Sequence, residues 1–180
     1  MKKWTWILIA VVLVGLIGGA SVLYNQLSVD YAPQQMVTQE VENLAPDFTV
    51  TDKDGNEVKL SDFFGKPIVL NFWASWCGPC KSEMPDFNEA YLAQGDEIQF
   101  LMVNMTDGYR ETLKIAQTFV ADAGYSFTVL YDVNRDAAAT YGISSLPTTL
   151  FIGADGVMVA YAMGAIDAET LQRGIAMIAE

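Results

Sequence analysis

Histidine is absent from the 180 residues, and cysteine occurs only twice. Without histidine the chain lacks the usual base of serine and cysteine hydrolases and the commonest ligand of zinc. Two thiolates alone leave a zinc ion short of ligands, so no metal site is expected. Positive charge is also scarce, since Lys and Arg number 10 against 22 Asp and Glu, for a formal net charge of −12. So acidic a chain is a poor match for nucleic acid or for anionic lipid headgroups.

Charge is missing altogether from a long N-terminal stretch. After the lysines at positions 2 and 3, residues 4–24 are almost wholly apolar. About 20 apolar residues cross a bilayer as a helix, so residues 1–24 are predicted to be a membrane anchor with the lysines on the inner side. A cleaved signal peptide is the alternative, because Gly18 and Ala20 have the spacing of a cleavage site. Either way, the rest of the chain is expected outside the cytoplasm.

The remainder divides into a tether and one domain. Residues 25–43 are mostly polar and lack periodicity, which is typical of a tether. Residues 44–180 alternate strand and helix patterns, which predicts an α/β domain with a mixed central sheet and helices on both faces. A hairpin is expected where residues 48–50 and 57–60 flank Asp54-Gly55. Further strands are expected at 67–73, 98–103, 128–131, 148–152 and 157–163, and helices at 81–94, 109–123, 134–141 and 167–178. Four aromatic residues are expected to fill the core: Tyr91, Tyr109, Tyr125 and Phe127.

Both cysteines stand in the pentad Trp76-Cys77-Gly78-Pro79-Cys80, between a predicted strand and a predicted helix. This spacing puts both sulfurs on the first turn of the helix, where unpaired N–H groups and the helix dipole favour a thiolate. Cys77 is expected to be exposed and to attack substrate, with its pKa lowered, and Cys80 to be buried and to resolve the mixed disulfide. Gly78 and Pro79 shape the loop, and Trp76 is the candidate for contact with partners. A structural bridge is the alternative, although closing so short a loop removes little chain entropy.

Several segments resemble known families. Residues 72–81 resemble the active-site run of thioredoxins, while residues 45–48 (Ala-Pro-Asp-Phe) and 80–85 (Cys-Lys-Ser-Glu-Met-Pro) resemble the TlpA/ResA branch. The resemblance covers about residues 44–178. It implies a thioredoxin fold with an added N-terminal β-hairpin and an inserted strand–helix element, in a membrane-anchored, extracytoplasmic thiol–disulfide oxidoreductase. It also implies that Leu146 and Pro147 form a cis-proline loop facing the cysteines, where Leu146 offers backbone hydrogen bonds to an extended substrate.

The chain departs from thioredoxins at one position. Asn71 stands where thioredoxins carry a buried aspartate, and an amide cannot accept a proton from Cys80. Glu83 matches the glutamate that the TlpA/ResA branch places near its disulfide, and is expected to take that proton. The alternative for Glu83 is an ordinary first-turn glutamate favoured by the helix dipole.

These features predict an enzyme that reduces disulfides in exported proteins and needs no cofactor beyond the Cys77–Cys80 pair. Its Gly-Pro dipeptide matches thioredoxin, whose potential of about −270 mV lies on the reducing side. The resemblance implies a membrane thiol donor of the CcdA/DsbD type, and apocytochrome c as one substrate class.

The sequence leaves three alternative functions open. The first is a disulfide oxidase or isomerase in the same compartment, and the second is a non-catalytic module with a permanent bridge. The third is a peroxiredoxin-like peroxidase, since residues 45–48 also resemble the start of those domains. Peroxiredoxins use an arginine near their cysteine, whereas Arg110, Arg135 and Arg173 are not adjacent to the pair in sequence.

Overall fold

The computed structural model describes residues 37–38 and 44–179, which lie in one compact unit, Met36–Glu180. The predicted anchor, residues 1–24, and most of the predicted tether, residues 25–43, fall outside this description. Among the residues described, no helix is long and apolar enough to cross a membrane. One short strand, β1 (Val37–Thr38), falls within the predicted tether and pairs antiparallel with β8 at the edge of the sheet.

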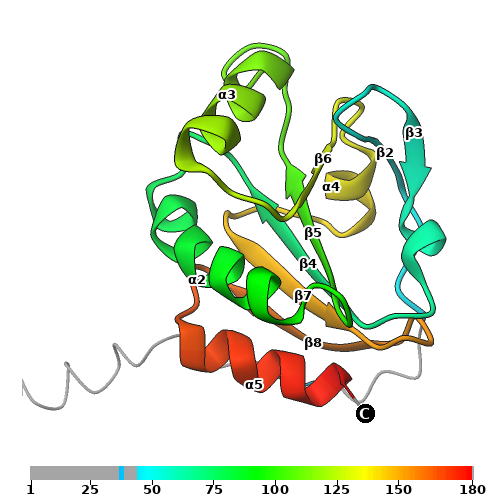
Figure 1. The fold of residues 1–180 in the computed structure, drawn as a ribbon. Helices are drawn as coiled ribbons and strands as arrows, with labels where there is room; N and C mark the ends of the chain where they lie inside the picture. Colours follow the sequence, from blue (N-terminus) through cyan, green and yellow to red (C-terminus); the bar gives the residue numbers. More distant parts are fainter. Residues whose placement is uncertain (1–36, 39–43, 180) are drawn as a thin grey trace, which may run out of the picture. The chain divides into compact units, whose positions relative to one another are not determined.

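One mixed sheet runs through the centre of the domain (Figure 1). The strand order is β1-β8-β7-β4-β5-β6-β2-β3. Strands β4, β5 and β6 run parallel, and β7 joins β4 antiparallel. All six residues of β4 are buried, as expected for a strand covered on both faces. The strands span β2 (Thr49–Thr51), β3 (Glu57–Lys59), β4 (Ile68–Trp73), β5 (Gln99–Asn104), β6 (Thr128–Tyr131), β7 (Thr148–Ile152) and β8 (Met158–Met163).

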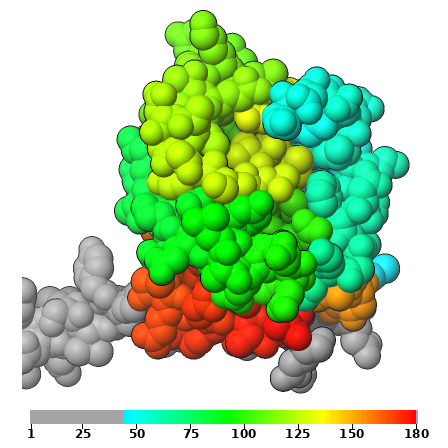
Figure 2. Space-filling view, viewed as in Figure 1, coloured from blue at the N-terminus to red at the C-terminus, as the bar shows by residue number. Residues whose placement is uncertain are grey.

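Helices cover both faces of the sheet, which confirms the predicted fold class. They span η1 (Leu60–Phe63), α2 (Gly78–Gln94), α3 (Leu113–Ala123), α4 (Asp136–Thr140) and α5 (Ala168–Ile178). Val69 and Trp73 of β4 belong to the core beneath α2, α3 and α5, whereas Leu70 and Phe72 belong to the core beneath η1 and α4. Helices α2 and α5 lie side by side on the first face (Figure 2). The alternation along β4 therefore decides which of its side chains face the cysteine helix.

The two elements implied by the family resemblance are present. Strands β2 and β3 form the N-terminal hairpin, with Gly55 in the left-handed region (φ 85°) at its turn. Between β5 and β7 the chain adds strand β6, which extends the parallel part of the sheet beside β5 and is followed by helix α4. Together with β7, β8 and α5, these elements complete a thioredoxin fold.

Two local predictions are wrong, and one side chain explains both. The helix expected from residue 109 begins only at Leu113, because Asp107 Oδ1 accepts backbone N–H groups of residues 109–111 and closes a turn there. Thr112 then caps the helix by accepting from the Ile115 N–H. Tyr109, expected in the core, lies on this turn and is 93% exposed. Tyr91, Tyr125 and Phe127 do pack in the core.

Candidate active site

The cysteine pair lies where β4 ends and α2 begins, as the sequence predicts. Cys77 is the N-cap residue of α2, and Gly78 and Pro79 are the first residues of the helix, which starts three residues before the predicted position. A disulfide joins Cys77 to Cys80, whose Cα atoms are 5.3 Å apart. The Cys80 N–H donates to Cys77 Sγ at 3.1 Å, so the sulfur acts as the helix cap. Pro79 suits this first turn because its missing N–H would have no partner within the helix.

The two sulfurs differ in access less than predicted. Cys77 was expected to be exposed, but it is only 5% exposed, and Cys80 is fully buried. Cys77 instead lines an open cleft of about 520 Å³, together with Trp76, Gly78 and Pro79. Cys80 is not among the residues that line this cleft, so of the two cysteines only Cys77 borders it.

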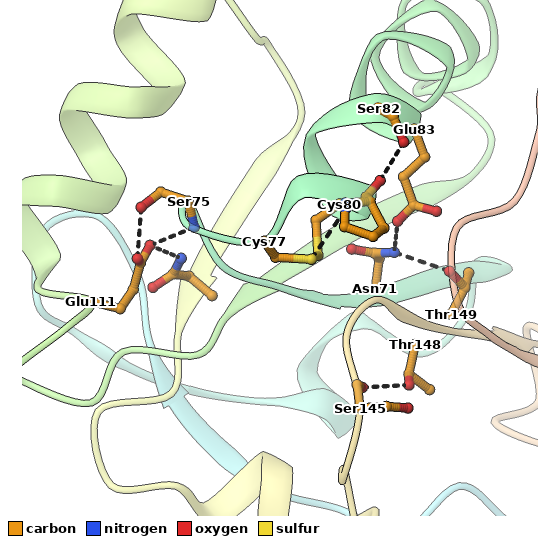
Figure 3. Close-up of a disulfide and its surroundings, with 12 residues drawn as sticks. Asn71, Ser75, Cys77, Cys80, Ser82, Glu83, Glu111, Ser145, Thr148 and Thr149 are labelled. Atoms are coloured by element: carbon orange, nitrogen blue, oxygen red, sulfur yellow. Dashed lines mark hydrogen bonds between the residues drawn. A yellow bond between two sulfur atoms is a disulfide. The ribbon is translucent and has the colours of Figure 1, made fainter.

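The opposite wall of the cleft comes from the loop before β7. The Leu146–Pro147 peptide bond is cis, as the resemblance implied. Leu146 lines the cleft with Cys77, whereas Pro147 is buried and its carbonyl accepts from the Gly164 N–H at 2.8 Å. A hydrogen bond spans the Leu146–Pro147 bond, because the Thr148 hydroxyl donates to the Ser145 carbonyl at 3.0 Å (Figure 3). The fold thus brings the cysteine turn next to the Leu146–Pro147 loop, although at least 66 residues separate the two in the sequence.

Glu83 lies on α2, one turn after Cys80, and is 2% exposed. Its Oε1 accepts from Asn71 Nδ2 at 2.9 Å and its Oε2 accepts from the Ile166 N–H at 3.0 Å. Burial raises the pKa of Glu83 to about 7, although both hydrogen bonds act to lower it. A carboxyl group with a pKa near neutrality exchanges protons readily at neutral pH, which is the property that proton transfer with Cys80 requires.

A second glutamate near the pair, Glu111, is fully buried, and the sequence did not predict it as a site residue. Its Oε1 accepts from the Ser75 N–H at 3.0 Å and from Asn104 Nδ2 at 2.8 Å, and its Oε2 accepts from the Ser75 hydroxyl at 2.7 Å (Figure 3). Glu111 therefore fastens the turn that leads into Cys77 to the end of β5. No local signal marks it, because 36 residues separate it from Ser75 and only the packing of the turn after β5 brings the two together.

Two arginines stand closer to the cysteines than the sequence suggested. The Arg110 guanidinium lies 3.8 Å from the ring centroid of Trp76, which is 41% exposed. Arg110 and Arg135 both line the cleft with Cys77. Arg110 and Arg135 are therefore near the pair in space, although they are not adjacent to it in sequence. Trp76 and Arg110 form a cation–π pair that presents a flat, charged surface at the rim.

Within residues 37–38 and 44–179, no three His, Cys, Asp or Glu side chains are grouped so as to hold a metal ion. A disulfide between two cysteines three residues apart at a helix N-terminus, facing a cis-proline loop across a cleft, defines a thioredoxin-fold thiol–disulfide oxidoreductase.

Known proteins place the chain within that class. The model of the AhpC/TSA family matches residues 41–161. A thiol-disulfide oxidoreductase ResA from Geobacillus thermodenitrificans is 34% identical over 139 residues, which cover 77% of this chain and 78% of that protein. The ResA of Bacillus anthracis is 38% identical over 131 residues, covering 71% and 72% respectively. The chain belongs to the AhpC/TSA family and, within it, to the ResA-like thiol–disulfide oxidoreductases.

Solved structures agree with this assignment. A thiol:disulfide interchange protein DsbE from Chlorobium tepidum has a TM-score of 0.69 at 30% identity, covering 81% of this chain and all of that one. An exposed lipoprotein thioredoxin from Streptococcus pneumoniae has a TM-score of 0.61 at 31% identity, covering 73% and 98%. The protein is accordingly an extracytoplasmic oxidoreductase that acts on protein thiols and disulfides.

Proposed function

We propose that this enzyme reduces disulfides in exported proteins by exchange through Cys77, with Cys80 as the resolving thiol. The observation that carries the proposal is the unequal access of the two sulfurs. Cys77 caps α2 and lines an open cleft, while Cys80 is fully buried and does not line it. One sulfur is therefore placed to capture a partner and the other to release it.

The exchange proceeds in two steps. In the reduced enzyme the Cys77 thiolate, stabilised by the amides of the first helical turn, attacks one sulfur of a substrate disulfide, and the other sulfur leaves as a thiolate. Cys80 then loses its proton and attacks the Cys77 sulfur, which expels the second substrate thiol. We assign the acceptance of that proton to Glu83, because its buried carboxyl has a pKa of about 7 and lies one turn from Cys80. The enzyme ends as the Cys77–Cys80 disulfide.

Substrate contacts follow from the cleft. Trp76, Gly78, Pro79 and Leu146 line it around Cys77, so an extended segment with its cysteine at Cys77 lies between the cysteine turn and the cis-proline loop. We infer that the Leu146 backbone pairs with this segment, and that Pro147 shapes the loop from its buried position. Because Trp76 is half-exposed at the rim, it contacts the partner protein beyond the disulfide.

Turnover requires a source of electrons and a fixed location. We infer that residues 1–24 anchor the enzyme in the cell membrane, that residues 25–43 tether the domain, and that a membrane thiol protein of the CcdA/DsbD type returns two electrons to the disulfide. The inference rests on the apolar N-terminal stretch and on the absence of any cysteine besides the pair. Apocytochrome c is one class of substrate compatible with this scheme.

Trapping tests the proposal directly. The full-length Cys80→Ser variant should accumulate mixed disulfides through Cys77 with exported proteins, because the attacking sulfur remains and the resolving sulfur is gone. The matched control is Cys77→Ser, which keeps one cysteine but presents only the buried one, and it should trap nothing. Equal trapping by both variants, or none by Cys80→Ser, would refute the assigned roles.

One further measurement distinguishes the proposed reductase from a peroxiredoxin-like peroxidase. The peroxidase is tested because Arg110 and Arg135 line the cleft with Cys77, and peroxiredoxins use an arginine near their cysteine. The wild-type enzyme should reduce insulin disulfides when supplied with dithiothreitol, and it should consume hydrogen peroxide no faster than the double cysteine-to-serine variant. Rapid, cysteine-dependent peroxide consumption without insulin reduction would favour the peroxidase instead.

A further inference from the structure

One buried polar atom beside the disulfide has no partner. Asn71, in the middle of β4, is fully buried, and its Nδ2 donates both to Glu83 Oε1 at 2.9 Å and to Thr149 Oγ1 at 3.0 Å. Its carbonyl oxygen, Oδ1, accepts no hydrogen bond from the described residues. Buried polar atoms in folded proteins nearly always find a partner, so this exception calls for a physical reason.

The partners of the amide group decide where that oxygen faces. The Asn71 Nδ2 group donates to two oxygens, Glu83 Oε1 and Thr149 Oγ1, so the N–H side of the amide points toward these two residues. The carbonyl is then turned to the other side, and Figure 3 shows it facing the sulfurs of the Cys77–Cys80 pair. Asn71 therefore lies between the buried carboxyl group and the disulfide, donating to one and offering an acceptor to the other.

A disulfide cannot use this acceptor, but a dithiol can. When a donor dithiol reduces the bond, two electrons enter the S–S bond and the Cys77 sulfur is released as a thiolate. Of the two protons that the donor loses, one binds the Cys80 sulfur and the other goes to solvent. Cys80, which is fully buried, then carries an S–H group, a weak donor that needs an acceptor inside the protein.

We propose that Asn71 Oδ1 accepts the S–H of Cys80 in the reduced enzyme, and that Asn71 is thereby a positioning residue that shifts the redox equilibrium toward the dithiol. The hydrogen bond exists only in the reduced form, whereas the unpartnered oxygen exists only in the oxidised form. Both differences favour reduction. The same contact keeps the proton on Cys80 and leaves the negative charge on Cys77, where exchange begins. The inference rests on the proposed function, in which Cys80 is the resolving thiol.

The redox equilibrium with a glutathione or dithiothreitol buffer tests the proposal. Asn71→Leu should shift the equilibrium constant about three- to tenfold toward the disulfide, the size expected for one net hydrogen bond. A tenfold shift corresponds to about 30 mV for this two-electron couple.

Asn104 supplies a matched control on the neighbouring strand. It is fully buried as well, but both ends of its amide are satisfied, by Glu111 Oε1 at 2.8 Å and by the Thr106 hydroxyl at 2.7 Å. Asn104→Leu should therefore destabilise both redox forms alike and move the equilibrium less than about twofold. A merely structural role for Asn71 predicts the same small change in Asn71→Leu, and that result would overturn the proposal.

Infrared spectroscopy tests the contact without any variant. The S–H stretching band of the reduced wild-type enzyme should lie below that of a thiol without a hydrogen bond, and it should return to the higher frequency in Asn71→Leu. A band at the frequency of a free thiol in the wild type would refute the contact. The trapping experiment with Cys80→Ser does not involve the Cys80 S–H group. If that variant traps partners but the S–H band of the wild type lies at the frequency of a free thiol, only the inference on Asn71 is overturned, and the proposed function stands.

Discussion

Replacing Glu83 by glutamine should abolish a loss of stability that the wild-type protein shows as pH rises through the range from about 4.5 to about 7. Glu83 is 2% exposed, and burial raises its pKa from the ordinary value of 4.5 to about 7. Between these two values the folded protein holds a proton that the unfolded chain has already released. The free energy of unfolding therefore falls with rising pH across this window, being highest below it and fully reduced above it.

The size of the effect follows from the two pKa values. They differ by about 2.5, and each pKa unit corresponds to about 1.36 kcal/mol, so Glu83 ionisation should lower the free energy of unfolding by about 3 kcal/mol. This is a large share of the stability of a domain, which is typically about 5–15 kcal/mol. The effect should thus be visible in the urea midpoint as well as in the extrapolated free energy.

The assay is urea unfolding of the oxidised wild type and of Glu83→Gln at a series of pH values from about 4 to about 8. Glutamine places an amide donor against Asn71 Nδ2 or the Ile166 N–H and adds a penalty of about 1–3 kcal/mol, but that penalty does not change with pH. The difference between the two curves therefore isolates the titration. Asp132, whose pKa burial also raises, contributes the same slope to both proteins.

Parallel curves for the two proteins across this window would refute the reasoning. The exchange reaction supplies a second, separate readout. If Glu83 accepts the proton of Cys80, the attack of Cys80 on the Cys77 sulfur should be slower in Glu83→Gln than in the wild type. The rate of that step should also no longer change with pH near 7. Unchanged exchange rates with a changed stability curve would mean that Glu83 is buried and titrates but takes no part in proton transfer.

Two further predictions concern packing and the support of the site. Gly174→Ala should destabilise the domain by about 1–3 kcal/mol in urea unfolding despite the higher helix propensity of alanine, because a Cβ at this position of α5 would clash with the ring of Phe151. Gly78→Ala, whose Cβ would meet nothing within 4 Å, is the matched control, and equal losses in the two variants would contradict the steric explanation. Glu111→Ala should cost about 3 kcal/mol and slow alkylation of reduced Cys77, because the Ser75 N–H, the Ser75 hydroxyl and Asn104 Nδ2 all lose their acceptor. Wild-type stability and alkylation rate in that variant would show that the turn before Cys77 needs no such support.

Local patterns were sufficient for the framework of the fold and for the redox pair. The Asp54-Gly55 turn lies between paired strands, and β6 and β7 have the bounds that their apolar runs predict. Two residues between Cys77 and Cys80 allow a bridge within one helical turn, so the sequence alone located it. These features depend on residues only a few positions apart, so the local sequence is sufficient to predict them.

The surroundings of the pair were decided only when distant segments packed together. Glu111 reaches Ser75 from 36 residues away, Arg110 reaches Trp76 from beyond β5, and Thr149 reaches Asn71 from 78 residues away. Tyr109 carries a core-forming side chain, yet the turn closed by Asp107 leaves it in solvent. Burial and the pairing of polar atoms depend on which segments the sheet places side by side. The raised pKa of Glu83 and the unpartnered oxygen of Asn71 are therefore properties of the folded core, whereas the position of the two sulfurs is a property of the sequence.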